Sequence, residues 1–381
     1  MRNNNSKPNV FVVDTPFQLL NAIEAAKHFA LSNSHLVIIK YPGLNQAAFD
    51  PLIKKNEWAE VMFLEMEKEE YRVCPFSSNV VVRKWYNWLL HFRRRNKFTK
   101  ICRSFGPANR LFLGHYWVPI KYYMRHFANN LKFEKLFLLD DGTDIININL
   151  QRKLAGNSTG KSGEAMKIPT GFSVRNIMTY LKKKYWDWNL GDAESLTFFT
   201  TYELGVRTGD QVIKNEYRYL RSVAVNSSAS EEVCFLGQCF AEDEYMSKES
   251  YLEHLKAVKE HFKGDKIIYV AHPRQSEQLL RTITVSLGWE VRRFGIPIEV
   301  AMVAGGYFPK VLASFNCSAL ESCSNIFDTR LKIACFRISP AHLLRWSLET
   351  AAIYEHFESK VGPSFEIIQI KIGDPQLTPY A

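Results

Sequence analysis

The sequence predicts an α/β fold of two doubly wound, Rossmann-like halves that face a central cleft. The chain has 381 residues, a length typical of two or three domains. Short apolar runs alternate with helical patterns along the chain, which is typical of parallel sheets covered on both faces. A polar stretch at 225–232 separates a first series of such units from a second.

The first half opens with a strand, a tight turn and a helix. The apolar run 9–13 is followed by Asp14-Thr15-Pro16 and then by apolar residues at helical spacing. Further strand-like runs follow at 35–39, 61–64, 110–113 and 135–139. From 151 to 170 the sequence is rich in polar residues and Gly without periodicity, so we expect a loop there. We assign residues 1–226 to the first domain.

The second half, residues 227–381, repeats this plan. Helices are predicted at 247–262, from 275 onward and at 341–357. Strands are predicted from 233 and at 266–271, 289–292, 311–315 and 331–336. In doubly wound folds the chemistry lies at the carboxyl ends of the strands, so functional side chains are expected at these positions.

Positive charge is concentrated in one stretch of the chain. The formal net charge is +10, yet no acidic residue lies between Glu70 and Glu134. Within this stretch a basic amphipathic helix is predicted by the spacing of Trp85, Trp88, Leu89 and Phe92 beside Arg83, Lys84 and Arg93 to Arg95. Its aromatic face can pack on the core, residues 83–103 can contact an anionic membrane or acidic glycolipid, or the helix can bind nucleic acid, for which no known module is visible.

The cysteines and the amino-terminal sequence indicate a cytoplasmic protein. Seven cysteines without a C-x-x-C spacing suggest neither a disulfide framework nor a zinc site, so we expect a reducing compartment. The sequence contains neither a signal-peptide pattern nor a long apolar stretch. Any membrane contact is therefore expected to be peripheral, at the inner membrane face.

Two motif-like segments are judged to be accidental. Residues 155–162 match a loose phosphate-binding P-loop, but Gly163 and Pro169 interrupt the helix that such a loop must open. The acidic residues 242–244 match a metal-binding acidic triplet only weakly. We therefore predict no metal site and no cofactor.

Paired carboxylates follow the last predicted strand of the first half. Asp140 and Asp141 stand on a turn with Gly142, directly after the run 135–139. Adjacent carboxylates repel each other, and partial burial raises a carboxyl pKa toward the range of a general base for an attacking hydroxyl. The alternative is an ordinary Asp-Gly turn with a helix cap.

The second half carries polar residues at comparable places. His272, followed by Pro273 and Arg274, comes directly after a predicted strand and can donate a proton or hydrogen bond to a leaving phosphate. A turn histidine with only structural contacts is the alternative.

Further candidates lie at the other turns of this half. Cys317 and Ser318 open a predicted helix whose N–H groups can receive a phosphate, unless they form a plain N-cap. Gly237 and Gln238 form a tight turn facing the same cleft, and Glu299 can accept hydrogen bonds from ribose hydroxyls, unless it is an ordinary exposed side chain.

Taken together, these segments resemble the bacterial sialyltransferases of glycosyltransferase family 52, the group that contains lipooligosaccharide and capsule sialyltransferases. The resemblance spans most of the chain and rests on the order and spacing of short motifs: DTPFQLL at 14–20, DDGT at 140–143, FFTT at 198–201, FLGQ at 235–238 with Glu242 and Tyr251, IYVAHPR at 268–274, PIE at 297–299 and SFNCSAL at 314–320. Related sialyl- and polysialyltransferases share an acidic pair with Gly, an HP pair and a serine pair. These map onto Asp140/Asp141, His272/Pro273 and Cys317/Ser318.

The resemblance implies a GT-B fold and metal-independent, inverting transfer of sialic acid from CMP-sialic acid to a galactose-terminated acceptor. Asp140 would be the base, and His272 would protonate or hydrogen-bond the departing CMP phosphate. The donor side would comprise Gly237, Gln238, Pro273, Arg274, Glu299, Cys317 and Ser318, and the acceptor side Thr15, Pro16 and Gln18. Asp141 and the carboxylates of the 242–243 turn remain alternative bases.

Two other functions fit the same residues. The enzyme can use another CMP-activated nonulosonic acid or Kdo as its donor. The chain can also be a non-catalytic protein on a degenerate transferase fold, which binds a membrane or polyanion through Arg93 to Arg95.

Overall fold

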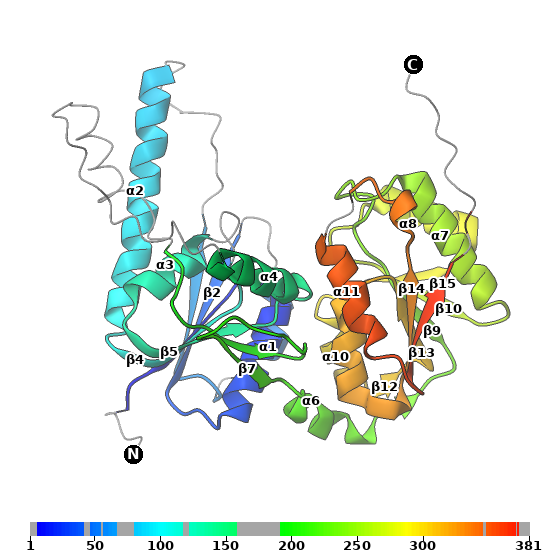
Figure 1. Ribbon diagram of the computed structural model, residues 1–381, viewed down its shortest axis with the longest axis horizontal. Coiled ribbons are helices and arrows are strands. Elements are labelled where there is room, and N and C mark those ends of the chain that lie inside the picture. Colours follow the sequence, from blue (N-terminus) through cyan, green and yellow to red (C-terminus); the bar gives the residue numbers. More distant parts are fainter. Residues whose placement is uncertain are drawn as a thin grey trace. The chain divides into compact units, whose positions relative to one another are not determined.

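A computed structural model describes residues 6–41, 46–54, 56–66, 80–116, 122–157, 191–345, 348–370 and 372 (Figure 1). Contacts divide the chain into two compact units, and most of the second is the chain from Lys214 onward. Each unit contains a parallel sheet with helices, so the predicted α/β class and the two Rossmann-like halves are confirmed. The predicted cleft and the predicted domain boundary after residue 226 stay predictions.

The first unit is built on a seven-stranded sheet with the order β3-β2-β1-β4-β5-β6-β7. Its strands are β1 (Asn9–Val13), β2 (Ser34–Lys40), β3 (Glu60–Glu65), β4 (Ala108–Leu113), β5 (Phe133–Leu139), β6 (Thr197–Thr200) and β7 (Gln211–Lys214). Its helices are α1 (Pro16–His28), α2 (Val80–Ser104), α3 (Tyr122–Asn130) and α4 (Asp144–Asn157). The strands from β3 to β6 pair in parallel.

The centre of this sheet is a row of stacked rings. The strand registers place Phe11 opposite Phe112 and Phe112 opposite Phe137. The ring centroids of the two pairs are 4.2 Å and 4.6 Å apart, and each pair is stacked. All five residues of β1 are buried, as expected for a central strand covered on both faces. These contacts fix the register of the strands that carry the turns described below.

The predicted basic helix exists as α2, whose amino-terminal half projects beyond the sheet in Figure 1. Leu89 and Phe92 are half-buried, Arg93 is exposed, and the side chains of Trp85 and Trp88 lie outside those described. Within the described chain, every helix is too short or too polar to cross a bilayer.

One predicted loop is partly wrong. Residues 151–157 continue helix α4, and the remainder of that prediction, with the P-loop-like residues 160–162, lies outside the described residues. This part of the helix is held by tertiary contacts, because the buried Arg152 bonds Asp210 and Asp192, and its polar composition does not reveal those contacts.

The second unit contains a six-stranded parallel sheet with the order β11-β10-β9-β13-β14-β15. Its strands are β9 (Val233–Leu236), β10 (Ile267–Val270), β11 (Glu290–Arg292), β13 (Val311–Ser314), β14 (Lys332–Arg337) and β15 (Phe365–Gln369). A separate parallel pair joins β8 (Ser228–Ala229) to β12 (Tyr307–Phe308). The helices are α6 (Arg218–Val223), α7 (Lys248–His261), α8 (Glu277–Leu287), α9 (Ile298–Gly305), α10 (Ser318–Phe327) and α11 (Leu348–Glu358).

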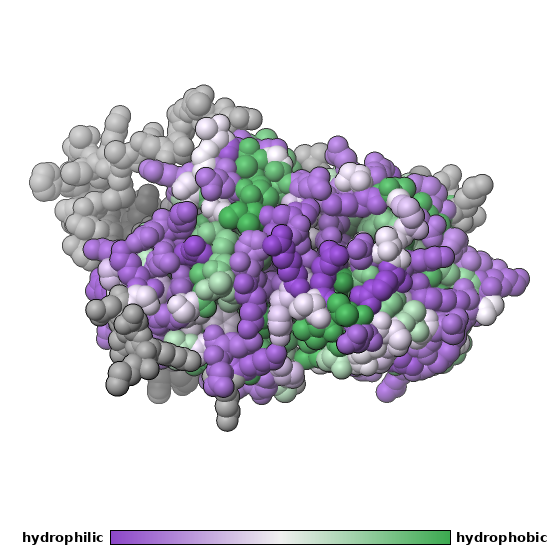
Figure 2. All heavy atoms as spheres, turned by 90° about the horizontal axis from the view of Figure 1, so that it is seen from below, coloured by the Kyte–Doolittle hydropathy of each residue, from purple (hydrophilic) through white to green (hydrophobic). Residues whose placement is uncertain are grey.

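The core of the second unit lies between its sheet and α7 and α8. Phe235, Tyr269 and Phe336 are among its fully buried side chains. The face drawn in Figure 2 is mostly hydrophilic, with limited hydrophobic areas.

The helix predicted at 341–357 is wrong at its start, because Pro340–His342 forms a short 3-10 turn and α11 begins only at Leu348.

The two sheets share one topology around their first strands. In each, the second and third strands lie on one side of the first strand and the later strands on the other. The strand order therefore reverses between β1 and β4 in the first unit, and between β9 and β13 in the second. Ligands of open α/β sheets bind at the carboxyl ends of the strands beside such a reversal. Most candidate residues lie on the turns at these two places and on the turns that follow the neighbouring strands β5 and β10, whereas Glu299 lies on α9.

Candidate active site

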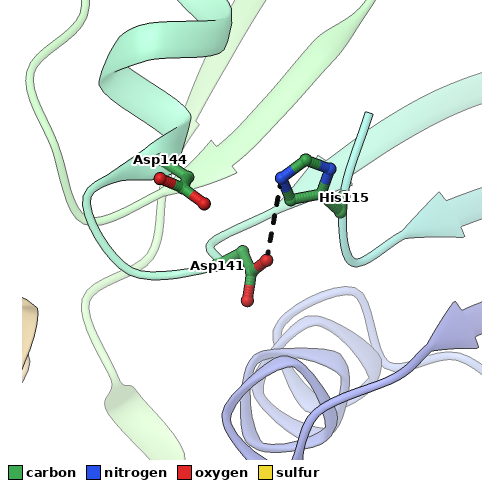
Figure 3. A group of neighbouring side chains, drawn as sticks. All are labelled: His115, Asp141 and Asp144. Carbon is green, nitrogen blue, oxygen red and sulfur yellow. Dashed lines mark ion pairs between the residues drawn. The ribbon is translucent and has the colours of Figure 1, made fainter. Parts of the chain in front are cut away.

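The turn after β5 carries the two predicted carboxylates. Asp140 is 1% exposed, and its carbonyl oxygen accepts a hydrogen bond from Asn21 Nδ2 at 3.1 Å. Asn21 lies on α1, so this contact ties the turn to the helix that follows β1. The side chain of Asp141 is 14% exposed, and its Oδ2 lies 3.9 Å from His115 Nε2 (Figure 3). Asp141 is thus the more accessible carboxylate of the pair.

His115 was not predicted as a site residue. It lies two residues after the end of β4, is buried, and its main-chain N–H donates to Met124 Sδ at 3.1 Å. With Asp141 and Asp144 it forms a group whose ligand atoms lie within 4.8 Å of one another. One imidazole and two carboxylates can hold a divalent cation, so the predicted absence of a metal requires a direct test.

The turn after β1 holds the predicted acceptor-side residues. Thr15 is the N-cap of α1, and its hydroxyl accepts from the main-chain N–H of Gln18 at 3.1 Å, while Pro16 stands at the first helical position. Asp14 is buried, and the Tyr123 hydroxyl donates to its Oδ2 at 2.7 Å. These caps and bonds explain why the DTP sequence forms a rigid turn.

The side chain of Gln18 contacts the turns that follow β1 and β4. Its Oε1 accepts from the main-chain N–H of Asp14 at 2.8 Å, and a Cβ placed on Gly114 would lie only 2.0 Å from that oxygen. The glycine after β4 is therefore required by this side chain. Within the described part of the chain, the buried Nε2 of Gln18 has no hydrogen-bond partner. A buried amide without a partner is costly, and a bound ligand can satisfy it.

In the second unit, the turns after β9 and β13 are joined by amide side chains. Gln238 Nε2 donates to Asn316 Oδ1 at 2.7 Å, and the Asn316 main-chain N–H donates to Gln238 Oε1 at 3.3 Å. The Ser314 hydroxyl donates to the carbonyl of Leu236 at 2.8 Å. The two turns at the reversal of strand order are held together by these bonds.

A buried network of hydroxyl and amide groups lies beneath Gly237. Gln275 Nε2 donates to the Tyr269 hydroxyl at 2.8 Å and to the Gln238 carbonyl at 3.0 Å. The Tyr251 hydroxyl lies 2.9 Å from that of Tyr269 and accepts from the Gln238 main-chain N–H at 3.1 Å. A Cβ on Gly237 would lie 2.3 Å from the Tyr269 hydroxyl oxygen. Only glycine therefore fits above this network.

His272 is half-buried on the turn after β10. Its main-chain N–H donates to Gln275 Oε1 at 3.0 Å, so the same glutamine holds both predicted donor-side turns. Its Nδ1 lies 2.9 Å from Cys239 Sγ and accepts from the main-chain N–H of Arg274 at 3.2 Å. Loss of hydration on burial, together with the positive charge of Arg274, lowers the pKa of His272 below the usual value.

The acidic turn at 242–243 binds the residues next to His272. Asp243 forms a bidentate ion pair with Arg274 at 2.7 Å and 2.8 Å. Glu242 Oε1 accepts from the main-chain N–H of Ser276, the N-cap of α8, at 2.9 Å. These carboxylates, which the sequence left open as bases, thus fix the HPR turn and the start of α8. The Arg274 guanidinium already has a carboxylate partner.

Helix α10 opens at Ser318, as its predicted phosphate-binding role requires. Cys317 is its N-cap residue. Burial raises the pKa of Cys317 to about 12, so the thiol is neutral. The amino end of α10 therefore keeps its positive dipole without a negative charge from Cys317.

Glu299 lies in the first turn of α9 and is 2% exposed. The Ser322 hydroxyl donates to its Oε1 at 2.5 Å, and burial raises its pKa. It is therefore not the ordinary exposed glutamate that the sequence left open as an alternative.

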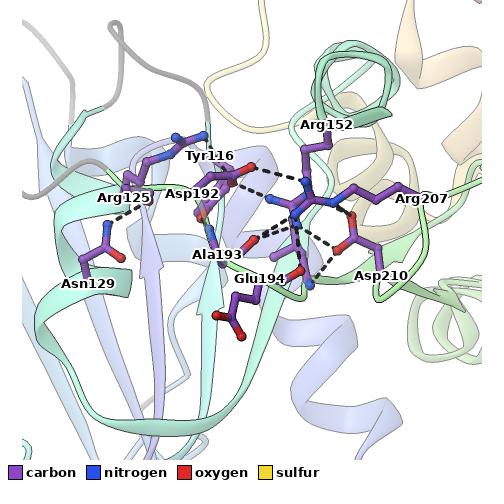
Figure 4. A network of polar contacts seen from close by, with 11 residues as sticks. Tyr116, Arg125, Asn129, Arg152, Asp192, Ala193, Glu194, Arg207 and Asp210 are labelled. Atoms are coloured by element: carbon purple, nitrogen blue, oxygen red, sulfur yellow. Dashed lines mark hydrogen bonds and ion pairs between the residues drawn. The ribbon is translucent and has the colours of Figure 1, made fainter. Parts of the chain in front are cut away.

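A charged network joins distant segments of the first unit (Figure 4). Arg152 on α4 is 3% exposed and donates two hydrogen bonds of 2.8 Å to Asp210 and one of 2.5 Å to Asp192. Arg207 Nε lies 3.3 Å from Asp210 Oδ2, and the Ala193 main-chain N–H donates to the Tyr116 hydroxyl at 2.8 Å. The network fixes α4 to the segment that leads into β6.

A family model described as Alpha-2,8-polysialyltransferase (POLYST) matches residues 9–333, which include both sheet centres and every turn described above. The chain belongs to this polysialyltransferase family. Its predicted class, a sialyltransferase, is confirmed at this level, and so is its nature as a glycosyltransferase enzyme. No curated protein sequence matches the chain.

Several solved structures are similar to this polysialyltransferase-family chain. One is the alpha/beta-galactoside alpha-2,3-sialyltransferase of the luminous marine bacterium Photobacterium phosphoreum, with 11% identity, a TM-score of 0.45, and coverage of 96% of this chain and 99% of that one. Another is MurG of Acinetobacter baumannii, with 8% identity, a TM-score of 0.41, and coverage of 95% and 86%.

Within each unit of this family member, the predicted site residues fall into connected groups. In the first unit, α1 joins the turn of Thr15, Pro16 and Gln18 to the turn of Asp140 and Asp141. In the second, hydrogen bonds join the turns that carry Gly237, Gln238, His272, Pro273 and Arg274. Cys317 and Ser318 follow Asn316, which bonds Gln238, whereas Glu299 bonds Ser322 one turn farther along α10.

Sequence reasoning missed three side chains that contact these groups. His115 was detectable, because it lies just past the carboxyl end of a predicted strand, two residues after β4. Cys239 and Gln275 lie a few residues beyond their strands, and only the folded turns bring them to His272.

Proposed function

We propose that the chain is an inverting, metal-independent sialyltransferase of the family 52 type. It would transfer sialic acid from CMP-sialic acid to a galactose-terminated glycan of a lipooligosaccharide or capsule. The observation that carries this proposal is the polysialyltransferase-family match, which spans the acidic pair, the HP pair and the start of α10.

The proposed reaction is a single displacement at the anomeric carbon of sialic acid. The acceptor hydroxyl gives its proton to a carboxylate of the β5 turn as its oxygen bonds the anomeric carbon. The bond from that carbon to the phosphate oxygen breaks, and CMP leaves as an anion with the electron pair. The greater exposure of Asp141, beside His115, favours it over the buried Asp140 as the base.

The leaving phosphate needs donors rather than a strong acid. In this proposal His272, the Ser318 hydroxyl and the amino end of α10 stabilise it, because fixed N–H and O–H dipoles offset developing negative charge. Gly237, Gln238, Pro273 and Arg274 shape the donor side, and Glu299 takes the ribose. Thr15, Pro16 and Gln18 line the acceptor side, where the buried Gln18 amide has a donor to offer.

The same proposal places the enzyme in the cytoplasm, at the inner membrane face. Arg93, Lys97, Lys100 and Arg103 are exposed on α2, and basic side chains of this density attract anionic lipid headgroups. Residues 83–103 would thereby bring the site to a glycolipid acceptor.

The decisive experiment measures CMP release from CMP-sialic acid with a galactoside acceptor in excess EDTA. We expect turnover to persist, with the sialylated product of inverted configuration by NMR. Activity that returns only with added Mg²⁺ or Mn²⁺ would show that the His115, Asp141 and Asp144 group binds a required metal and would contradict the metal-independent mechanism.

A donor panel tests the identity of the sugar. CMP-Kdo and another CMP-nonulosonate are offered beside CMP-sialic acid, with mass detection of the product. A product from either of these alone would change the assigned donor but keep the transferase. No product from any donor, together with salt-sensitive vesicle binding, would favour the non-catalytic membrane-binding function.

A further inference from the structure

The ring of His272 is held on one side by two contacts to the same nitrogen. Cys239 Sγ lies 2.9 Å from Nδ1, and the main-chain N–H of Arg274 donates to Nδ1 at 3.2 Å. Cys239 itself is buried, on the turn that follows β9. The imidazole is therefore clamped between a side chain of one turn and the main chain of its own turn.

These contacts determine where the imidazole proton lies. A main-chain N–H group can only donate, so Nδ1 must present its lone pair to Arg274. A neutral imidazole that accepts at Nδ1 carries its proton on Nε2. Burial raises the pKa of Cys239 to about 11, so its thiol keeps its proton at neutral pH and is a donor toward the same lone pair.

We propose that Cys239 is a positioning residue, which together with the Arg274 main-chain amide holds His272 as a neutral imidazole with its proton on Nε2. The ring orientation is then fixed at one edge, and Nε2–H is the group left for the substrate. This inference deepens the proposed function and rests on it for the identity of that substrate.

The charged groups around the ring agree with a neutral imidazole. Burial and the positive charges of Arg274 and Arg293 lower the pKa of His272, whereas Asp243 and Glu242 raise it, and the net direction is down. A neutral imidazole at pH 7 stabilises departing CMP by donating a hydrogen bond, without transferring its proton. The leaving phosphate then departs as the anion, and the acceptor's proton stays on the carboxylate of the first unit.

The direct test is ¹⁵N NMR of the full chain labelled in its histidines, with His272→Gln to identify the resonances. At pH 7 we expect Nδ1 of His272 to be unprotonated and Nε2 protonated. A ring protonated on Nδ1 in the wild-type chain would overturn the proposal, whatever the behaviour of any variant.

Two variants of Cys239 separate hydrogen bonding from packing. Cys239→Ser keeps a donor and should preserve the titration of His272. Cys239→Ala removes it and should raise the pKa of His272 by roughly half to one unit, because one hydrogen bond to the neutral form is lost. An unshifted titration in folded Cys239→Ala, with circular dichroism as the check on folding, would contradict the role of the thiol.

A matched control comes from another cysteine of the same sheet. Cys234 is half-buried on β9, and its pKa is likewise raised by burial, but its neighbours are Glu232, Arg292 and Glu290. Cys234→Ala should leave the titration of His272 unchanged. An equal shift in both alanine variants would mean a general loosening of the sheet and would refute a specific role for Cys239.

Kinetics connect the clamp to the reaction. With CMP-sialic acid, kcat of Cys239→Ala should fall about three- to tenfold, with Cys239→Ser restoring most of it, and the KM of the donor should change less. Wild-type kcat should not decline between about pH 7 and 9, as it would if an imidazolium had to give up its proton. If no donor is turned over, the proposed function fails. The NMR result still tests whether Cys239 and the Arg274 amide hold the proton of His272 on Nε2.

Discussion

At the scale of single residues, Gly237 shows how tightly the donor-side turn is packed. A methyl group at this position would meet the Tyr269 hydroxyl at 2.3 Å and Gln275 Oε1 at 2.6 Å, and both are buried. We expect Gly237→Ala to lower the free energy of unfolding by about 2 kcal/mol through overpacking. Urea denaturation followed by circular dichroism measures this.

Gly295 provides the matched glycine control, because a Cβ placed there meets nothing within 4 Å. Gly295→Ala should change the free energy of unfolding by less than about 0.5 kcal/mol. Equal losses in the two variants would show that the contact with Tyr269 does not determine the requirement for glycine at position 237.

The two carboxylates of the β5 turn can be separated by amide substitution. Asp141→Asn should reduce kcat by ~10²-fold or more, because the proposed base is lost while the shape of the turn is kept. Asp140→Asn should cost less in turnover and more in stability if this buried residue mainly supports the turn. Initial rates of CMP release and urea unfolding measure the two effects.

Asp265→Asn is the control for these substitutions, since its carboxylate pairs with Lys310 and belongs to no turn that carries a candidate residue. Its rate should equal that of the wild type. Loss of turnover confined to Asp140→Asn would transfer the role of base to Asp140.

The sequence could place residues that stand directly after strands. Asp140 and His272 were predictable because an apolar run marks where a strand ends. Residues just past that end lie at the edge of the sheet where ligands bind. The partners of these residues were not predictable, because Asn21 reaches Asp140 from a helix far away in sequence, and Cys239 reaches His272 from the neighbouring strand's turn.

At the scale of elements, a buried ion pair joins α10 to α11. Glu321 is 2% exposed, and His356 Nε2 lies 3.1 Å from its Oε2, with Lys360 Nζ 3.4 Å from Oε1. Burial opposes ionisation of Glu321, but the hydrogen bond and charge of His356, together with Lys360, outweigh it and lower its pKa below the usual value. The ionised form is therefore the one that the fold stabilises.

This pair predicts the direction of an acid-dependent loss of stability. A lowered pKa in the folded state stabilises the protein at pH values above the unfolded pKa, and this contribution disappears as pH falls through the folded pKa. Glu321→Gln should therefore be less stable than wild type by about 1–3 kcal/mol at pH 7, and the difference should shrink below about pH 4.

Urea unfolding across this pH range measures the difference. Glu358→Gln, whose carboxylate is half-exposed and pairs with Arg337, is the control and should show little change at either pH. A gap between Glu321→Gln and wild type that widens on acidification would contradict the assigned sign.

Strands marked by an apolar run were predictable, and several strands of mixed composition were not. The run 9–13 coincides with β1, because a central parallel strand is apolar throughout. Strands β6, β7 and β15 were not assigned, since their few residues mix polar and apolar types, and pairing with a neighbour determines their conformation. Helix α4 likewise continued into a segment whose composition resembles a loop.

At the scale of the whole molecule, binding of the nucleotide should stabilise the chain. A ligand that binds only the folded state raises the free energy of unfolding by about 2.7 kcal/mol at one hundred times its dissociation constant. We expect CMP to raise the Tm, and UDP and ATP to leave it nearly unchanged. Differential scanning fluorimetry with the three nucleotides at equal concentration measures this.

His272→Ala tests the site, and Lys256→Ala on the exposed surface of α7 is the matched control. Lys256 forms an exposed ion pair with Glu253 on α7, so its variant should keep the full CMP response, whereas His272→Ala should reduce it. A Tm raised by ATP and not by CMP would contradict the assigned donor class.

The general plan of the molecule was predictable, whereas the arrangement of side chains within it was less so. The alternation of strand-like and helical patterns in the sequence predicts two parallel sheets. The structure has both, with matching strand order around their first strands. The hydrogen bonds that join Gln238 to Asn316, and Gln275 to three partners, depend on turns whose shape no local pattern specifies.

The Arg152 network has a consequence for engineering this protein. Its arginine precedes residues 158–190, its partners Asp192 and Asp210 follow them, and the bonds between them fasten the two flanks to each other. Replacing the intervening stretch with that of another family member would thus keep the bonds that join the two flanks. Such an exchange should retain the arginine and the two aspartates, because their bonds fix the segments on either side of it.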